Sequence, residues 1–378
     1  MLLRGIGQSA REAWEVPRDL LLGRYPAFVT GGGLARGEVP VFVFHDAEPE
    51  SFARKLEHLA RNRYATLSIE EYLGVLRGSR PAPERAVLLT FDDGRGSLWS
   101  VAAPLLRRHG MRAVVFLVPG RVPAHAPRPA SEHVALMSWE EIETLARGGL
   151  FDFQSHTLLH ARVHTGPALA GFVTPRSQHG YDAFDQPLVR YAERDLVGAE
   201  VPLGTPLLQS SPRTSEELRF FEAEAVRAAC VAAVADRGGD AFFRRPDWYK
   251  RLRAVFGGER VEGRIETSSE QSAAIRRELV DARRIIEERV GRPVVHLCYP
   301  WHAAGPTARR LAAEAGYETA FCGKVDGVPV TLPGGDPRAI ARLSEDYLEL
   351  LPGDGRGSLA AVLRRKWSRR FGSTPGVR

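Results

Sequence analysis

The sequence predicts an α/β fold with a parallel sheet, and three features indicate it. Apolar runs of strand length alternate with stretches of helical spacing from about residue 39 to 163 and again from about 270 to 345. Some of these runs end in ionisable residues, as at Asp92 and Asp93, and parallel sheets carry their chemistry at the carboxyl ends of strands. Between the two stretches, at residues 164–269, the alternation stops, which predicts an inserted subdomain or lid.

The expected strands are apolar runs bounded by glycine, proline or acidic residues. They fall at residues 39–44, 86–91, 113–118, 150–155, 294–298 and 318–321. Helical spacing predicts helices between them, at residues 49–63, 97–109, 271–290 and 307–315. Two more helices are indicated by capping boxes, Ser68 to Glu71 and Ser138 to Glu141, in which each end residue satisfies a backbone donor of the other.

The remaining segments are less regular. Residues 1–38 are expected to form a leader or flap, with weak helical spacing at 10–22. The insert is expected to hold a helix at 215–236 and a small aromatic core. Residues 346–378 predict a basic helix and tail around Trp367, which could contact an anionic membrane surface, remain a solvated face, or close the main domain.

Composition excludes several classes of protein. The 378 residues carry a formal charge of +6, but the arginines are dispersed and accompany no nucleic-acid motif, so no nucleic-acid partner is expected. The three cysteines are odd in number and lack metal-ligand spacing, which argues against a disulfide framework. No run approaches the ~18 apolar residues of a membrane span, and no secretory signal opens the chain, so a cytoplasmic location is expected. The oligomeric state is not indicated.

Ionisable residues at three strand ends predict a catalytic site. Asp92 and Asp93 follow one strand, His156 and His160 follow another, and a turn follows Cys298. Two imidazoles and one carboxylate form a metal site with open positions, and a second carboxylate can accept a proton from water, which suits hydrolysis of an amide or ester. Each motif alone is weak, since Asp-Asp-Gly is also ordinary turn composition and His-x-x-x-His occurs on surfaces.

Together these motifs resemble those of the polysaccharide deacetylases with the NodB homology domain. The resemblance rests on Thr90-Phe-Asp-Asp-Gly94, on Met137 to Glu141 leading into Ser155-His-Thr-Leu-Leu-His160, and on Cys298-Tyr-Pro-Trp301. The stretch Val41 to Asp46 also resembles the opening strand of the branch that acts on poly-N-acetylglucosamine. The resemblance covers residues 39–163 and 270–345, and it implies a distorted (β/α) barrel of about seven parallel strands with the large insert.

The resemblance also implies roles for individual residues. Asp93, His156 and His160 would bind a divalent metal, usually zinc. Asp92 would be the general base that deprotonates the attacking water. The backbone N–H of Trp301 would stabilise the oxyanion, a role that tolerates a change of side chain because the donor belongs to the main chain.

Two departures from the family pattern concern the base and the acid. Cys298 stands where many relatives have an arginine that orients the base. The family's last motif supplies a histidine that protonates the departing amine, but no histidine follows His302, and the best positional match, residues 342–345, lacks one. His302 is therefore the first candidate for the acid and His45 the second; for each, a histidine that only completes a hydrogen-bond network is the alternative.

The sequence thus predicts a metal-dependent hydrolase that removes acetyl groups from N-acetylated amino sugars or acetylated polysaccharide, in bacterial exopolysaccharide or cell-envelope glycan metabolism. The alternative is a saccharide-binding or assembly protein with weakened catalysis, which the missing acid histidine favours. The presence of both Asp92 and Asp93 opposes it, because a binding protein has no use for the base.

Overall fold

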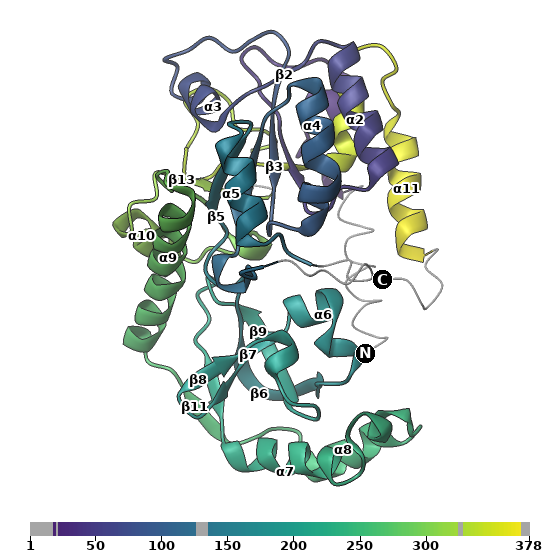
Figure 1. Ribbon diagram of the computed structural model, residues 1–378, viewed down its shortest axis with the longest axis vertical. Helices are drawn as coiled ribbons and strands as arrows, with labels where there is room; N and C mark the ends of the chain where they lie inside the picture. Colours follow the sequence, from purple (N-terminus) through teal and green to yellow (C-terminus); the bar gives the residue numbers. More distant parts are fainter. Residues whose placement is uncertain (1–17, 20–21, 126–134, 324–327, 372–378) are drawn as a thin grey trace.

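The computed structural model describes residues 18–19, 22–125, 135–323 and 328–371 (Figure 1). Its largest element is an eight-stranded parallel sheet, in which seven strands follow the order β13-β12-β5-β4-β3-β1-β14 and β2 pairs with β3. The strands are β1 Val41–Phe44, β2 Ala65–Thr66, β3 Ala86–Phe91, β4 Ala113–Leu117, β5 Phe151–Ser155, β12 His296–Cys298, β13 Thr319–Phe321 and β14 Leu343–Ser344. The predicted fold class, a distorted parallel barrel of about seven strands, is therefore confirmed.

Helices cover the outside of this sheet (Figure 1). They are α2 Pro49–Arg61, α3 Ile69–Leu76, α4 Ala103–His109, α5 Trp139–Arg147, α9 Ser268–Val290, α10 Pro306–Glu314 and α11 Leu359–Phe371. The π-helical turn η2 Leu98–Ala102 precedes α4, and the 3-10 turns nearest the sheet are η1 Ala27–Thr30, η3 Pro119–Arg121, η7 Pro300–His302 and η8 Glu345–Leu350. Both predicted capping boxes are present, at Ser68 and Ser138, and a third at Thr267 begins α9.

The segment from Ile340 to Ser344 closes the sheet into a barrel. Ile340 forms a parallel bridge with Phe321 of β13, and Leu343 pairs with Phe42 of β1, so the segment joins the two edges. Between these contacts, Arg342 donates its backbone N–H to the carbonyl of Gly323 at 3.1 Å. Closure removes the open edges that would otherwise expose unpaired backbone groups.

Alternation along the strands separates two hydrophobic cores. One core lies inside the barrel, where Phe116 and Phe321 meet with ring centroids 5.0 Å apart. The other lies between the sheet and the outer helices, and it includes Phe91 of β3. Because side chains alternate along a strand, Leu88, Thr90 and Asp92 form one inward row on β3. Asp92 thus extends a row of interior side chains.

The insert folds as a second unit beneath the barrel (Figure 1). It contains a four-stranded sheet in the order β8-β7-β6-β9 and a hairpin of β10 and β11. Its elements are β6 Arg162–Phe172, η4 Arg176–Gln178, α6 Gly180–Phe184, β7 Pro187–Tyr191, β8 Arg194–Leu196, η5 Gly198–Glu200, β9 Pro206–Pro212, β10 Phe220–Glu222, α7 Glu224–Ala235, η6 Gly239–Arg244, α8 Trp248–Phe256 and β11 Gly263–Ile265.

The prediction of a helix at 215–236 was wrong for the first part of this range. Residues 220–222 form β10, which pairs antiparallel with β11, and the helix begins only at Glu224. Pairing across the hairpin overrides local helical spacing there. The aromatic residues of the insert do form a core, which includes Phe172, Phe242 and Phe256.

The ends of the chain are only partly described. Most of the weakly helical stretch predicted at 10–22 lies outside the described residues. The basic C-terminal helix is present as α11, where Lys366 pairs with Asp346 at 3.4 Å and the Trp367 side chain is exposed. Within the described part of the chain, no helix combines the length and the apolar character that crossing a membrane requires.

A buried ion pair accompanies the closure of the barrel. Both Nη atoms of Arg342 donate to the Asp92 carboxylate at 2.7 Å, and both side chains are almost completely buried. Burial alone would raise the pKa of Asp92, but the charges of Arg342 and His156 hold it below its usual value. Asp92 therefore stays ionised in the folded protein, and its stabilising effect is present above the pKa of an unfolded carboxyl and lost as the pH falls.

We expect Arg342→Met to lower the free energy of unfolding by about 3–5 kcal/mol at pH 7, because it leaves the Asp92 charge buried without a partner. The loss should shrink as the pH falls, since protonation of Asp92 relieves the penalty in the variant and removes the benefit in the wild type. Urea unfolding measured at several pH values checks this. Arg310→Met, which removes an exposed pair with Glu314, is the control and should leave the free energy of unfolding nearly unchanged because solvent screens that pair. Equal losses in the two variants would contradict the prediction.

Candidate active site

The turn after β3 brings two carboxylates to the same place. Asp92 continues the inward row of the strand, whereas Asp93 has a φ of 69° and Gly94 a φ of 76°, so the backbone leaves the extended conformation at once. A Cβ on Gly94 would lie 2.6 Å from Cδ2 of Leu117, which explains the need for glycine. The left-handed backbone thus begins at Asp93, one residue before Gly94.

Asp93, His156 and His160 converge as a possible metal-binding group. Their ligand atoms lie within 4.8 Å of one another, and all three residues are buried. Oδ1 of Asp93 is 3.6 Å from Nε2 of His156 and 3.8 Å from Nε2 of His160, and it has no hydrogen-bond partner. A buried carboxylate oxygen without a partner, facing two imidazole nitrogens, fits a divalent cation.

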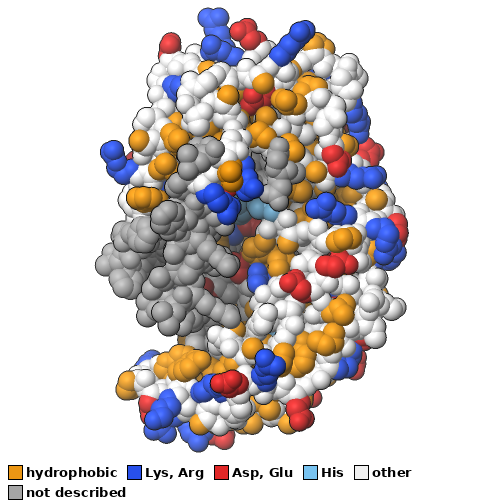
Figure 2. Space-filling view, turned by 180° about the vertical axis from the view of Figure 1, so that it is seen from behind, with side chains coloured by type: hydrophobic (Ala, Val, Ile, Leu, Met, Phe, Trp, Pro, Cys, Tyr) orange, Lys and Arg blue, Asp and Glu red, His pale blue; other side chains and the backbone are white. Residues whose placement is uncertain are grey.

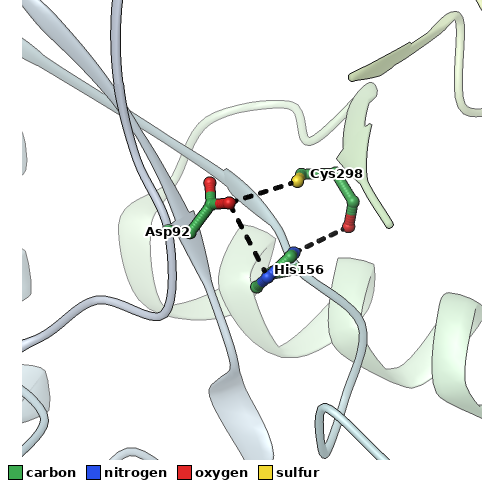
Figure 3. Close-up of side chains that lie close together, drawn as sticks. All are labelled: Asp92, His156 and Cys298. Atoms are coloured by element: carbon green, nitrogen blue, oxygen red, sulfur yellow. Dashed lines mark hydrogen bonds and ion pairs between the residues drawn. The ribbon is translucent and has the colours of Figure 1, made fainter. Parts of the chain in front are cut away.

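His156 is held in the tautomer that a metal ligand needs. Its Nδ1 lies 2.8 Å from the carbonyl oxygen of Cys298, so Nδ1 carries the proton and donates it (Figure 3). The lone pair of Nε2 is then free to face Asp93. The strand pairing of β5 with β12 sets this contact, because Ser155 and Leu297 are register partners.

The ligand atoms of a second group, Asp92, His156 and Cys298, also lie within 4.8 Å of one another (Figure 3). The chemistry of these side chains is less suited to a metal ion. Both oxygens of Asp92 already accept hydrogen bonds from Arg342. Burial, the largest cause, raises the pKa of Cys298 well above its usual value, so the sulfur is a neutral thiol and not the thiolate that binds metals. The group containing Asp93 is therefore the better site.

Arg342 fills the position that the sequence left without an arginine. Cys298 packs against it, with Sγ 2.9 Å from Nη2 of Arg342, and the guanidinium reaches Asp92 from the segment that lies between β13 and β1. In the sequence, residues 342–345 are only the best match to the family's last motif, and they lack its histidine. Nothing in the order of the motifs indicates that this arginine replaces the one missing at Cys298.

Arg95 is a second residue that sequence reasoning missed. Its Nε and Nη2 donate to Oδ2 of Asp93 at 2.9 and 2.7 Å, which leaves Oδ1 to face the histidines. Burial would raise the pKa of Asp93, but Arg95 and then His160 lower it to about 2. The position of Arg95 two residues after Asp93 is a signal that could have found it, because a turn brings such residues together.

Trp301 and His302 lie on a strained turn after β12. Their φ values are 49° and 59°, and Asp93, Thr157 and His160 also have positive φ; these five are among seven such non-glycine residues in the described chain. The Trp301 ring packs on His160 with centroids 4.0 Å apart. Left-handed backbone at non-glycine residues is typical of functional sites, where the surrounding structure holds the strain.

His302 and His45 occupy different environments. His302 is an exposed residue, but the protein atoms around its ring and the charge of Arg342 lower its pKa. His45 follows β1, its side chain is 50% exposed, and Nε2 lies 4.0 Å from Oδ2 of Asp92. Figure 2 shows a hollow in this face of the molecule with pale-blue histidine atoms at its base. His164, by contrast, is buried in the insert beside Glu222.

The insert covers part of the site through α6. The Tyr181 hydroxyl donates to Asp46, and the guanidinium of Arg95 lies 4.1 Å from the centroid of the Tyr181 ring. Phe184 packs on His160 at a centroid distance of 4.8 Å. Asp185 follows, with Oδ1 3.8 Å from Nδ1 of His160; burial first and the charge of Asp93 second raise its pKa to about 6. The sequence did not indicate these contacts.

Comparison with curated proteins points to one family. YxkH of Bacillus subtilis, a polysaccharide deacetylase by name, is 26% identical over 187 residues, which are 43% of this chain and 61% of YxkH. The poly-β-1,6-N-acetyl-D-glucosamine N-deacetylase of Escherichia coli is 28% identical over 120 residues, which are 30% of this chain and 18% of that enzyme. The chain thus spans less than two thirds of the length of these relatives.

Solved structures show the same fold. The deacetylase domain of BpsB from Bordetella bronchiseptica aligns with a TM-score of 0.51 at 18% identity, over 81% of this chain and 95% of that domain. A de-N-acetylase from Aggregatibacter actinomycetemcomitans aligns with a TM-score of 0.50 at 15% identity, over 86% and 99% of the two chains. At these identities the likeness concerns the fold alone.

The sequence model of the polysaccharide deacetylase family matches residues 79–179. This range contains Asp92, Asp93, His156 and His160, so the match covers the strand ends that build the site. Family match, curated relatives and barrel fold agree with the resemblance read from the motifs. Residues 79–179 therefore match the polysaccharide deacetylase family, and the barrel around them has the fold of solved deacetylases.

Proposed function

We propose that this protein is a metal-dependent deacetylase that hydrolyses the N-acetyl group of amino sugars in an acetylated polysaccharide. The observation that carries the proposal is the arrangement of four side chains: Asp93, His156 and His160 converge on one point, and Asp92 lies beside them with its carboxylate 4.0 Å from His156. Three protein ligands that leave a position open for water, with a carboxylate beside them, are typical of metal sites that hydrolyse amides.

Asp93, His156 and His160 would hold the metal, and zinc suits a set of two imidazoles and one carboxylate. When bound, a divalent cation would acidify water and polarise the acetyl carbonyl. Arg95 keeps Asp93 ionised, and the Cys298 carbonyl keeps His156 in the right tautomer. The residues present fit such a cation because Oδ1 of Asp93 is buried and has no other partner.

Asp92 would accept the proton of the attacking water. Arg342 fixes the orientation of its carboxylate and keeps it ionised, so the base is available at neutral pH. The bidentate contact also stops the carboxylate from turning to replace Asp93 as a metal ligand. The two neighbouring carboxylates therefore have separate roles, set by their different arginine partners.

The turn after β12 would support the tetrahedral intermediate. We assign the backbone N–H of Trp301 to the oxyanion, as the motif implies; a main-chain donor on a strained, well-held turn is fixed in place before the reaction begins. The Trp301 ring, packed on His160, would then form one wall for the sugar.

Two histidines are candidates for protonation of the departing amine, and their environments favour His45. A general acid must hold a proton near neutral pH, but desolvation and the charge of Arg342 lower the pKa of His302 and so disfavour its protonated form. His45 is half-exposed at the same rim and faces the Asp92 carboxylate. This reverses the order of preference that the sequence suggested.

The alternative of a saccharide-binding protein without efficient turnover finds less support. A binding protein gains nothing from a buried carboxylate held ionised by a dedicated arginine, which is the situation of Asp92. The names of the relatives suggest poly-β-1,6-N-acetyl-D-glucosamine as the glycan to test first, and a role in bacterial exopolysaccharide or cell-envelope glycan metabolism.

We expect the wild-type protein to release acetate from oligomers of β-1,6-linked N-acetylglucosamine and to lose this activity with a chelator. Asp93→Ala should abolish metal binding, whereas Asp92→Asn should keep the metal and lose at least about 10²-fold in kcat, because only the base is removed. Acetate assays and metal analysis of each purified variant check this, with the exposed Asp281→Asn as control. Acetate release by Asp92→Asn at the wild-type rate would exclude Asp92 as the base.

We expect His45→Ala to lower kcat by about 10²–10⁴-fold and to remove the alkaline limb of the pH profile. In the wild type this limb is the fall in rate at high pH, where the general acid loses its proton. His302→Ala should keep the shape of the profile. The two variants act as controls for each other because both remove an imidazole at the rim. Loss of the alkaline limb in His302→Ala alone would assign the acid to His302.

A further inference from the structure

We infer that Asp185, contributed by the insert, is a positioning residue for His160, so that the insert completes the metal site of the barrel. The inference rests on the proposed function, because it concerns the same metal. It goes beyond that function in assigning a role to a segment outside the barrel, which the sequence left as an insert or lid.

The first observation is an unsatisfied nitrogen on His160. Nε2 of this ring faces Asp93, whereas Nδ1 points away, is buried and has no hydrogen-bond partner. Oδ1 of Asp185 lies 3.8 Å from Nδ1, somewhat beyond the ~3.0 Å of a hydrogen bond. A buried ring nitrogen beside a carboxylate needs only a small shift of either side chain to donate its proton.

The second observation is the contrast with His156. There Nδ1 donates to the Cys298 carbonyl at 2.8 Å, a partner that the barrel itself supplies. A metal-binding histidine generally donates its other N–H to such a partner, which fixes both the tautomer and the ring orientation. For His160, Asp185 occupies the place of that partner, and its negative charge would also strengthen the ligand in the presence of a cation.

The third observation is that the segment before Asp185 is anchored to the barrel. Nη1 of Arg121 donates to the Phe184 carbonyl at 2.7 Å, and its guanidinium lies 4.7 Å from the centroid of the Phe184 ring. The hydroxyl of Tyr181 is bound to Asp46. Contacts at both ends of α6 therefore hold Asp185 where it can meet His160.

A merely structural role is the competing explanation. The charged groups that act electrostatically on Asp185 are one carboxylate, Asp93, and three guanidinium groups, those of Arg95, Arg121 and Arg162. If Asp185 served only as their counterion, removing its charge would change stability and leave metal affinity alone. Metal affinity therefore separates the two roles, and the apoprotein and metal suffice to measure it.

The test compares Asp185→Asn with Asp182→Asn in the full-length protein. Asp182 lies on α6, which Asp185 directly follows, and it pairs with Arg176, so it is a matched control. Zinc affinity is measured by competition with a chromophoric chelator, and the visible spectrum of the cobalt-loaded protein reports the ligand geometry. We expect zinc affinity about 10–100-fold weaker and an altered cobalt spectrum for Asp185→Asn, and no change for Asp182→Asn.

Zinc affinity of Asp185→Asn within twofold of the wild type, with an unchanged cobalt spectrum, would overturn the inference. Asp185→Glu provides a second measurement, because it keeps the carboxylate and should retain more zinc affinity than Asp185→Asn; equal losses would also overturn it. Failure of the wild-type protein to bind zinc or cobalt would instead contradict the proposed function itself.

Discussion

The ion pair between Arg342 and Asp92 is the interaction on which the rest of this structure depends. Arg342 lies on the segment that joins the two edges of the barrel, and Asp92 lies at the end of a central strand. Two buried charges are costly to desolvate, so such a pair persists only with good geometry and complete partners. Here the guanidinium also binds Thr90 and the Cys322 carbonyl. The segment that closes the barrel therefore also supplies the arginine that orients the proposed base.

The rigid sheet explains how the site tolerates several non-glycine residues with left-handed backbone conformations. The left-handed residues around the site each cost free energy, on the order of 1–3 kcal/mol. They persist because the parallel strands beside them are buried and paired on both sides. Cys298, for example, is paired with Phe321, and its carbonyl fixes His156. The sheet keeps the strained residues in place, so that Oδ1 of Asp93 stays directed at the Nε2 atoms of His156 and His160.

The sequence predicted what depends on local pattern. The barrel strands β1, β3, β4, β5, β12 and β13, the helices that follow them and both capping boxes were predicted from periodicity and end signals, whereas β2, β14 and the strands of the insert were not. The order of the motifs indicated the Asp93, His156 and His160 group. The sequence did not predict contacts between residues that are distant in the chain and meet only in the folded protein. Arg342 lies 250 residues from Asp92, and Asp185 is separated from His160 by the strand β6, so neither position carries a local signal of its partner. The strand at 220–222 was missed for the same reason, because its partner at 263–265 is distant in the chain.

The proposed metal ligands are held from two sides, and this limits how the insert can move. His156 depends only on the barrel, through the Cys298 carbonyl. Asp93 depends on Arg95, whose guanidinium packs against Tyr181 of the insert, and His160 packs against Phe184. Two of the three ligands therefore contact α6 directly or through one residue. A displacement of α6 would therefore disturb the surroundings of both ligands at once.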